Sequence, residues 1–345
     1  MSKGTMKAAV LRQFGQPLTM EDKPIPVPGP REVLVKVKAS GLCVSDLHIQ
    51  DGIIGTVRLP YTPGHEMAGV IVQLGEGVSR VKVGDHIVGA IDVTCGTCRY
   101  CLGGRTNLCR NLVRIGFERD GSHEEYCVIP EDNAFKVADL VPFDQMTSIT
   151  DAVGCMYNAI KNRAKVRPGD RVLILGTGGL GMNAIQIAKL FGAEVYATSR
   201  QQEKLNISLK MGADAVINTK GQNLHEEIVR LTNGEMCDVV IDNIGIKTSI
   251  NDSLKFVCSG GRVIVAGYND PLFEADFQDV MKYEKEIIGI RGMTRQDLAE
   301  VIHFVETGKI VPFIFKTIPF AEINAGLDML RTGEAKGRVV LTMND

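Results

Sequence analysis

The pattern of apolar and polar positions changes character along the chain near residue 150. Before that point, short apolar stretches are separated by Gly and Pro, a pattern typical of antiparallel β-structure. Strands are expected at residues 8–11, 32–39, 69–74, 85–89 and 125–130. Pro24, Pro26, Pro28 and Pro30 lie in one extended stretch that cannot be helix interior. The first part is therefore predicted to be a β-rich, barrel-like domain.

After residue 150, apolar strand-like segments alternate with stretches of helical spacing. The expected strands are 171–175, 194–198, 215–217, 239–241, 262–265 and 286–289. The expected helices are 151–164, 180–191, 201–212, 223–233, 247–258 and 275–283. This alternation predicts a doubly wound parallel sheet. A helix at 295–307 and a strand at 337–342 follow, and the pattern alone does not say which domain they join.

The length of 345 residues suits about two domains, each large enough for its own core. The chain has 39 basic and 41 acidic residues, so it lacks the basic excess of proteins that bind nucleic acid or anionic lipid. No apolar run approaches the roughly 18 residues of a membrane-spanning helix, and no signal-peptide core follows Met1. We therefore expect a soluble, cytoplasmic protein without nucleic-acid or membrane partners.

A glycine-rich sequence of the form G-x-G-x-x-G follows the first strand of the second part. It contains Gly176, Gly178, Gly179, Leu180 and Gly181 and opens the next helix. In such a loop the glycines permit a tight turn, a close approach of backbone to pyrophosphate, and close helix–strand packing. Although this motif alone is weak, the surrounding strand, helix and strand favour dinucleotide binding over a plain turn.

The second strand of this part ends at Ser199 and Arg200, where an NAD-binding site usually carries an acidic residue for the ribose hydroxyls. A hydroxyl followed by a guanidinium suits a 2′-phosphate instead, through charge-assisted hydrogen bonds. The alternative is a serine that caps a helix beside a solvated arginine. The sequence thus favours NADP(H), and NAD(H) stays open.

Four of the nine cysteines lie within fifteen residues, at Cys95, Cys98, Cys101 and Cys109. In a reducing compartment this crowding indicates metal ligation rather than disulfides, and the odd total argues against complete pairing. Four thiolates complete a tetrahedral zinc site and leave no open position, so the role would be structural. An iron–sulfur cluster is the less favoured alternative.

Other candidate metal ligands are Cys43, His65, Glu66 and Asp151, which no local spacing links. Taken singly, such a cysteine is more often a small buried apolar residue, and such a histidine is more often simply hydrogen-bonded. Their order along the chain changes this interpretation. The segment from Cys43 to His48, the Gly64-His65-Glu66 triplet, the four-cysteine segment and the later glycine fingerprint follow one another in a specific order.

This combination resembles the medium-chain, zinc-dependent alcohol dehydrogenase family over essentially the whole chain. The resemblance implies an α/β protein in which a GroES-like, barrel-like catalytic domain accompanies a Rossmann domain. The implied divisions are 1–152 for the catalytic zinc domain, 153–292 for the Rossmann domain, and 293–345 for a C-terminal return to the catalytic domain.

The resemblance also implies a catalytic zinc. Cys43 and His65 match two of its ligands, and Glu66 matches a neighbouring glutamate that can also coordinate. Asp151 stands where many relatives have a cysteine, and its carboxylate is itself a proper zinc ligand. Cys155 lies nearby, but the spacing to the following residues favours Asp151.

Three further positions take implied roles in catalysis. Ser45 corresponds to the hydroxyl that hydrogen-bonds the substrate oxygen, and His48 to the distal member of a proton relay. Asp46 matches a carboxylate that orients the ligand histidine. His123 occupies a commonly apolar position, and a structural or surface role is favoured over substrate contact.

The implied activity is reversible hydride transfer between an alcohol or carbonyl substrate and NADP(H), with two zinc ions per chain and a homodimeric or homotetrameric assembly. One alternative is a reductase of activated double bonds such as enoyl thioesters, although those relatives commonly lack the zinc ligands. The other is a non-catalytic protein that binds dinucleotide. The particular alcohol cannot be deduced from the sequence.

Overall fold

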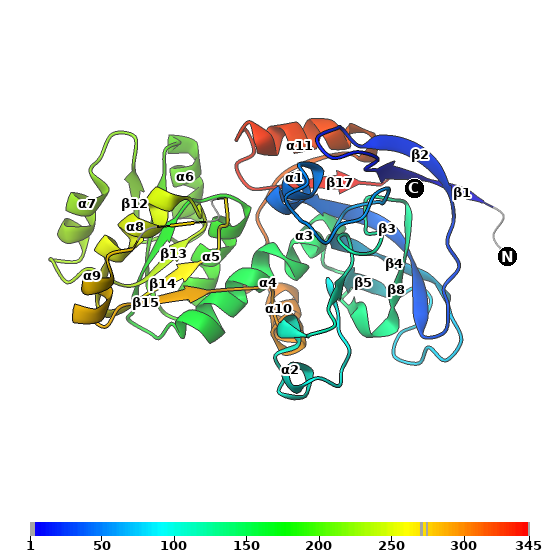
Figure 1. Cartoon of the computed structure of the whole chain (residues 1–345), viewed down its shortest axis with the longest axis horizontal. Helices are drawn as coiled ribbons and strands as arrows, with labels where there is room; N and C mark the ends of the chain where they lie inside the picture. The colour runs from blue at the N-terminus through cyan, green and yellow to red at the C-terminus, as the bar shows by residue number, and fades with distance from the viewer. Residues whose placement is uncertain (1–3, 270–271, 274, 344–345) are drawn as a thin grey trace. The chain divides into compact units, whose positions relative to one another are not determined.

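The computed structural model describes residues 4–269, 272–273 and 275–343 (Figure 1). The chain forms two compact units, which we describe separately. Unit 1 comprises Met1–Gly154 and Met293–Asp345, and unit 2 comprises Cys155–Gly292. The first division thus falls after Gly154, against the expected division after residue 152. No helix in the described ranges is long and apolar enough to cross a membrane.

Unit 1 is built on a seven-stranded sheet with the order β16-β17-β3-β4-β5-β9, in which β8 also pairs with β3. The strands are β3 (Glu32–Leu42), β4 (Glu66–Leu74), β5 (His86–Gly89), β8 (Tyr126–Pro130), β9 (Ala134–Lys136), β16 (Ile314–Pro319) and β17 (Arg338–Thr342). A separate hairpin joins β1 (Thr5–Val10) to β2 (Thr19–Pro24). Because β17 pairs antiparallel with β3, the C-terminal segment is part of this sheet.

Alternation along β3 directs one set of side chains into the core of unit 1. Val33, Val35 and Val37 are fully buried and pack with Ile71 of β4 and Ile87 of β5. This period of two is the signature of a strand with one buried face.

The helices of unit 1 are short or flank the sheet. They are α1 (Val44–Gln50), α2 (Arg99–Leu102), α3 (Phe143–Thr147), α10 (Arg295–Glu306) and α11 (Ile323–Arg331), and α4 (Ala152–Tyr157) crosses the division between the units. The sequence pattern predicts α10 but misses α1, α2, α3, α11 and β16. Helix α1 begins directly after β3, and the carboxylate of Asp46 accepts the backbone N–H of its N-cap residue, Cys43.

Unit 2 contains a parallel sheet with the order β12-β11-β10-β13-β14-β15. The strands are β10 (Arg171–Leu175), β11 (Glu194–Ser199), β12 (Ala215–Asn218), β13 (Cys237–Asp242), β14 (Val257–Val265) and β15 (Glu286–Gly289). The helices are α5 (Gly179–Leu190), α6 (Gln202–Lys210), α7 (Leu224–Leu231), α8 (Lys247–Phe256), α9 (Phe277–Lys282) and a π-helical segment, Asn158–Ala164.

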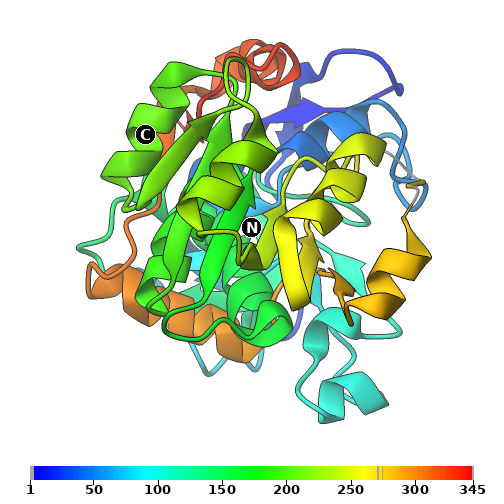
Figure 2. The same cartoon turned by 90° about the vertical axis from the view of Figure 1, so that its left-hand side faces the viewer.

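Helices flank this sheet on both faces (Figure 2). The strand order reverses between β10 and β13, which is the position where doubly wound folds bind nucleotides. The predicted Rossmann architecture is confirmed.

Candidate active site

Four side chains with metal-binding atoms meet in unit 1. They are Cys43, His65, Glu66 and Asp151, and one ligand atom from each lies within 4.8 Å of the others. Cys43, His65 and Glu66 are buried, while Asp151 is partly exposed. We call this set the mixed-donor cluster. The structure brings together every residue that the sequence analysis proposed for the catalytic zinc.

Sheet register explains most of this convergence. Glu66 begins β4 and is paired with Gly41 of β3, so His65 and Glu66 lie beside the end of β3, where Cys43 follows. On the other side of β3, Leu42 pairs with Val339 of β17. Asp151 reaches the same place from the turn that precedes α4.

The donor distances in this cluster suit a zinc ion. Tetrahedral zinc with bonds of about 2.0–2.3 Å places its ligand atoms roughly 3.3–3.8 Å apart. The Cys43 Sγ lies 3.3 Å from Asp151 Oδ2, and His65 Nε2 lies 4.0 Å from the same oxygen. One thiol, one imidazole and carboxylate oxygens are all ordinary zinc ligands. The residues present therefore fit the ion that the sequence predicts.

Asp46 ties two of these donors together. Its Oδ2 accepts the backbone N–H of Cys43 at 2.8 Å, and its Oδ1 lies 3.5 Å from His65 Nδ1. Burial alone would raise the pKa of Asp46, yet the imidazoles of His65 and His123 hold it well below its usual range. Asp46 is thus an anion that faces Nδ1 of His65, while Nε2 faces the donor cluster.

Arg338 is a site residue that the sequence analysis missed. Its guanidinium is buried and forms ion pairs with Glu66 and, at 2.8 Å, with Asp151. Burial raises the pKa of Glu66, and the charge of Arg338 opposes that effect. One signal in the sequence could have pointed to Arg338: it is a charged residue directly before the apolar run Val339–Leu341 in a predicted strand. Arg338 supplies positive charge to a cluster that is otherwise rich in acidic groups.

Ser45 and His48 lie on α1, three residues apart and therefore on one side of the helix. Ser45 is partly exposed, and its Oγ lies 3.7 Å from Cys43 Sγ. His48 is buried. The relay assigned to these two residues stays a prediction.

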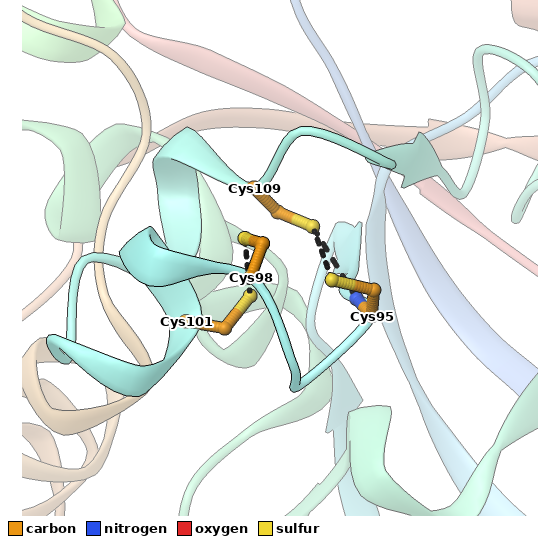
Figure 3. A group of neighbouring side chains, drawn as sticks. All are labelled: Cys95, Cys98, Cys101 and Cys109. Atoms are coloured by element: carbon orange, nitrogen blue, oxygen red, sulfur yellow. Dashed lines mark hydrogen bonds between the residues drawn. The ribbon is translucent and has the colours of Figure 1, made fainter.

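The four cysteines of the predicted structural site form a second group in unit 1 (Figure 3). The Sγ atoms of Cys98 and Cys101 lie 3.6 Å apart, and those of Cys95 and Cys109 lie 3.5 Å apart. These separations are close to the edges of a tetrahedral zinc–sulfur site. Backbone N–H groups of Thr97 and Cys98 lower the pKa of Cys95 to about 6, which favours the thiolate that a metal requires.

In unit 2 the glycine fingerprint forms the turn between β10 and α5. Gly176 has a φ of +83°, which glycine adopts readily. A Cβ at Gly181 would lie 2.1 Å from the carbonyl oxygen of Gly176, so the turn itself requires glycine there. A Cβ at Gly178 would meet no atom within 4 Å. The fold therefore leaves Gly178 open toward a ligand, as close approach to a pyrophosphate needs.

Ser199 ends β11 and is partly exposed, and Arg200 follows it as an exposed residue. The Ser199 hydroxyl accepts the backbone N–H of Gln201 at 3.1 Å, so it has a local turn-stabilising role. Within the described ranges, no ion pair or hydrogen bond holds the Arg200 guanidinium.

His123 corrects one expectation. The sequence analysis expected a structural or surface role for His123, and the surface position is wrong because the His123 side chain is fully buried. Its Nε2 lies 3.6 Å from Asp46 Oδ1, beside the mixed-donor cluster.

Comparison with known proteins agrees with this arrangement. Residues 29–139 match the alcohol dehydrogenase GroES-like domain, and residues 179–307 match the zinc-binding dehydrogenase domain. An alcohol dehydrogenase from Geobacillus stearothermophilus is 35% identical over 341 residues, which cover 98% of this chain and 100% of the relative. The chain belongs to the medium-chain, zinc-dependent alcohol dehydrogenase family. Like the other members of this family, it is an oxidoreductase.

Solved structures support the same assignment. An NAD-dependent alcohol dehydrogenase superposes with a TM-score of 0.94 at 33% identity, covering 98% of this chain and 100% of the other. A cobalt- and zinc-bound thermostable alcohol dehydrogenase from Pyrobaculum aerophilum gives a TM-score of 0.89 at 32% identity, with the same coverage. The family resemblance predicted from the motifs is confirmed.

We predict two zinc ions per chain, which elemental analysis of the purified protein measures. Cys98→Ser should remove the ion of the four-cysteine site. Because the four ligands of that ion lie within one short segment, the variant should chiefly lower the free energy of unfolding. Cys43→Ser should remove the other ion and abolish turnover, while circular dichroism shows a retained fold. Wild-type protein that holds one zinc or none would contradict the assignment of at least one cluster.

We predict opposite outcomes for two glycines of the fingerprint. Gly181→Ala should lower the free energy of unfolding by about 1–3 kcal/mol, because its methyl group meets the Gly176 carbonyl. Gly178→Ala should cost no more than about 1 kcal/mol, the usual cost of alanine at a helix N-cap, yet weaken dinucleotide binding. Urea unfolding without ligand and titration with dinucleotide separate the two effects. Wild-type affinity in Gly178→Ala would argue against the pyrophosphate site.

Proposed function

We propose that the protein is a zinc-dependent alcohol dehydrogenase, or carbonyl reductase in the reverse direction, that transfers a hydride between an alcohol and NADP(H). The observation that carries this proposal is the mixed-donor cluster. Strand register and Asp46 hold Cys43 and His65 together, Arg338 pairs with Asp151 beside them, and the three donors suit a zinc ion. The glycine fingerprint of unit 2 supplies the dinucleotide site that hydride transfer requires.

Cys43, His65 and Asp151 would hold a zinc ion that supplies Lewis acidity toward the substrate oxygen, and the glycine fingerprint would hold the nicotinamide cofactor that supplies hydride chemistry. In alcohol oxidation, the Ser45 hydroxyl accepts the proton of the substrate hydroxyl and gives its own proton toward His48. His48 lies on the same side of α1 and passes the proton on to solvent. In carbonyl reduction these proton transfers run in reverse. Asp46 holds the His65 imidazole in place throughout.

A panel of linear, secondary, polyol and aromatic alcohols, assayed with NADP⁺ and NAD⁺, tests this function. We expect oxidation of at least one class, measured as formation of reduced nicotinamide, and its loss after treatment with a strong zinc chelator. Re-addition of zinc should restore the activity.

The same assay separates the two alternatives. A double-bond reductase would consume an enoyl thioester with reduced cofactor, and the chelator would leave its rate unchanged. A non-catalytic protein would bind dinucleotide and turn over no substrate. Either result would overturn the proposed function.

We propose NADP(H) as the preferred cofactor because of the residues at the end of β11. Ser199 stands where a carboxylate would repel a 2′-phosphate, and the neighbouring Arg200 is exposed and can supply paired donors.

Arg200→Ala should raise the Michaelis constant for NADP(H) roughly 10- to 150-fold, since charged hydrogen bonds contribute about 1.5–3 kcal/mol. The constant for NAD(H) should change little. Ser199→Asp should shift preference toward NAD(H) through repulsion of the 2′-phosphate. Lys210→Ala, which removes an exposed charge at the far end of α6, is the matched control. Preference of the wild type for NAD(H) would refute the assignment.

We further propose a homodimer or homotetramer, which sedimentation velocity measures directly. The supporting feature is a set of exposed apolar side chains in one stretch of unit 2, Leu272, Phe277 and Met281. Strand β15 follows these residues in the sequence and is the last strand in the order of the sheet. Among the described strands, it pairs only with β14. An open strand edge of this kind is a ready site for pairing with a second copy.

A further inference from the structure

Three buried polar atoms converge behind the mixed-donor cluster. Asp46 Oδ1 lies 3.5 Å from His65 Nδ1 and 3.6 Å from His123 Nε2. Within the described part of the chain, all three atoms are shielded from solvent and none of them has a hydrogen-bond partner. A buried polar atom without a partner costs about 1–3 kcal/mol. Pairing these atoms with one another would therefore lower the free energy of the folded protein.

The far side of the His123 ring determines which nitrogen carries the proton. His123 Nδ1 lies 2.9 Å from Ser40 Oγ, which in turn lies 2.6 Å from Ser122 Oγ. Both serines are fully buried. If Ser40 donates its hydroxyl proton to Nδ1, the neutral imidazole carries its proton on Nε2, facing Asp46. The chain Ser122, Ser40, His123, Asp46 then has a donor and an acceptor at every step.

The backbone fixes this ring relative to the ligand histidine. The N–H groups of Ser122 and His123 donate to the carbonyls of Gly64 and Pro63, directly before His65, at 2.8 and 3.0 Å. A Cβ at Gly64 would lie 2.6 Å from His123 N and 2.7 Å from its Nδ1. The ring of His123 is therefore held at close range to the segment that carries His65.

From this geometry we propose that His123 is a positioning residue for the catalytic metal. With its proton on Nε2, it presents a donor to Asp46 Oδ1 at 3.6 Å, and Asp46 in turn orients the His65 imidazole and the Cys43 backbone. Partners that contact a metal-binding imidazole directly, as Asp46 does, commonly contribute about 10- to 100-fold to metal affinity, and His123 acts through Asp46. The inference rests on the proposed zinc site at the mixed-donor cluster, and it concerns metal retention rather than contact with substrate.

Release of zinc from the two-metal protein to an excess of a metallochromic chelator tests this role without any substrate. Cys43→Ser, which lacks the ion of the mixed-donor cluster, identifies the phase of release that belongs to that ion. His123→Phe keeps a ring of similar size but removes the donor to Asp46. It should weaken zinc retention in that phase by up to about 10-fold and leave the four-cysteine phase unchanged.

Two variants separate positioning from packing. His123→Gln offers an amide N–H in place of Nε2–H and should restore most of the zinc retention. His86→Phe is the matched control, because His86 Nδ1 also lies 3.6 Å from a carboxylate, that of Asp139, outside the mixed-donor cluster. His86→Phe should release zinc as the wild type does. If His123→Phe fails to fold, Ser40→Ala should show a smaller change in the same phase.

The outcomes are distinct. Unchanged release in folded His123→Phe, or in Ser40→Ala if the phenylalanine variant fails to fold, overturns the role of His123 and leaves the proposed function intact. Equal losses in His123→Phe and His123→Gln indicate a packing role and also overturn it. Wild-type protein without zinc in the mixed-donor cluster overturns the zinc-dependent function together with this inference.

Discussion

The balance of charge around buried Glu66 is the constraint on which the organisation of unit 1 depends. A fully buried carboxylate is costly unless a buried cation and hydrogen bonds compensate it. Arg338 provides that cation and also contacts Asp151. Because Arg338 begins β17, the strand that pairs with β3, the C-terminal segment completes both the sheet and the charge balance. This dual role gives a physical reason for the chain to return to unit 1 after the Rossmann unit.

Features set by local periodicity were predictable from the sequence. The strands and helices of unit 2 lie close to their expected positions because each buried strand gives a continuous apolar run, and the fingerprint marks the β10–α5 turn. Helix α1 and strand β16 were missed, since α1 is a short helix that itself carries polar site residues and β16 has mixed polarity. The contacts of Arg338 could not be foreseen, because strand order decides which distant residues become neighbours.

His123 shows the same limit within the candidate site. In the sequence it is a polar residue at a commonly apolar position, and nothing local distinguishes a surface histidine from a buried one. Its burial is favourable because Ser40, on β3, and Asp46, on α1, face opposite sides of its ring. These partners come from separate elements, so only the assembled fold reveals them. The family resemblance, by contrast, placed Asp151 with Cys43, and the structure brings the two side chains together.

The two candidate metal sites differ in how they are held together. The four cysteines lie within one short segment, where backbone N–H groups stabilise thiolates and the site is defined almost locally. The mixed-donor cluster gathers ligands from the first residue of β4 and the residue before it, and from the residues after β3 and before α4, and its charges depend on Asp46 and Arg338. A locally built thiolate site suits permanent structural binding. A site assembled from distant partners lets each partner adjust ligand orientation and charge, which is what a metal that must also bind substrate requires.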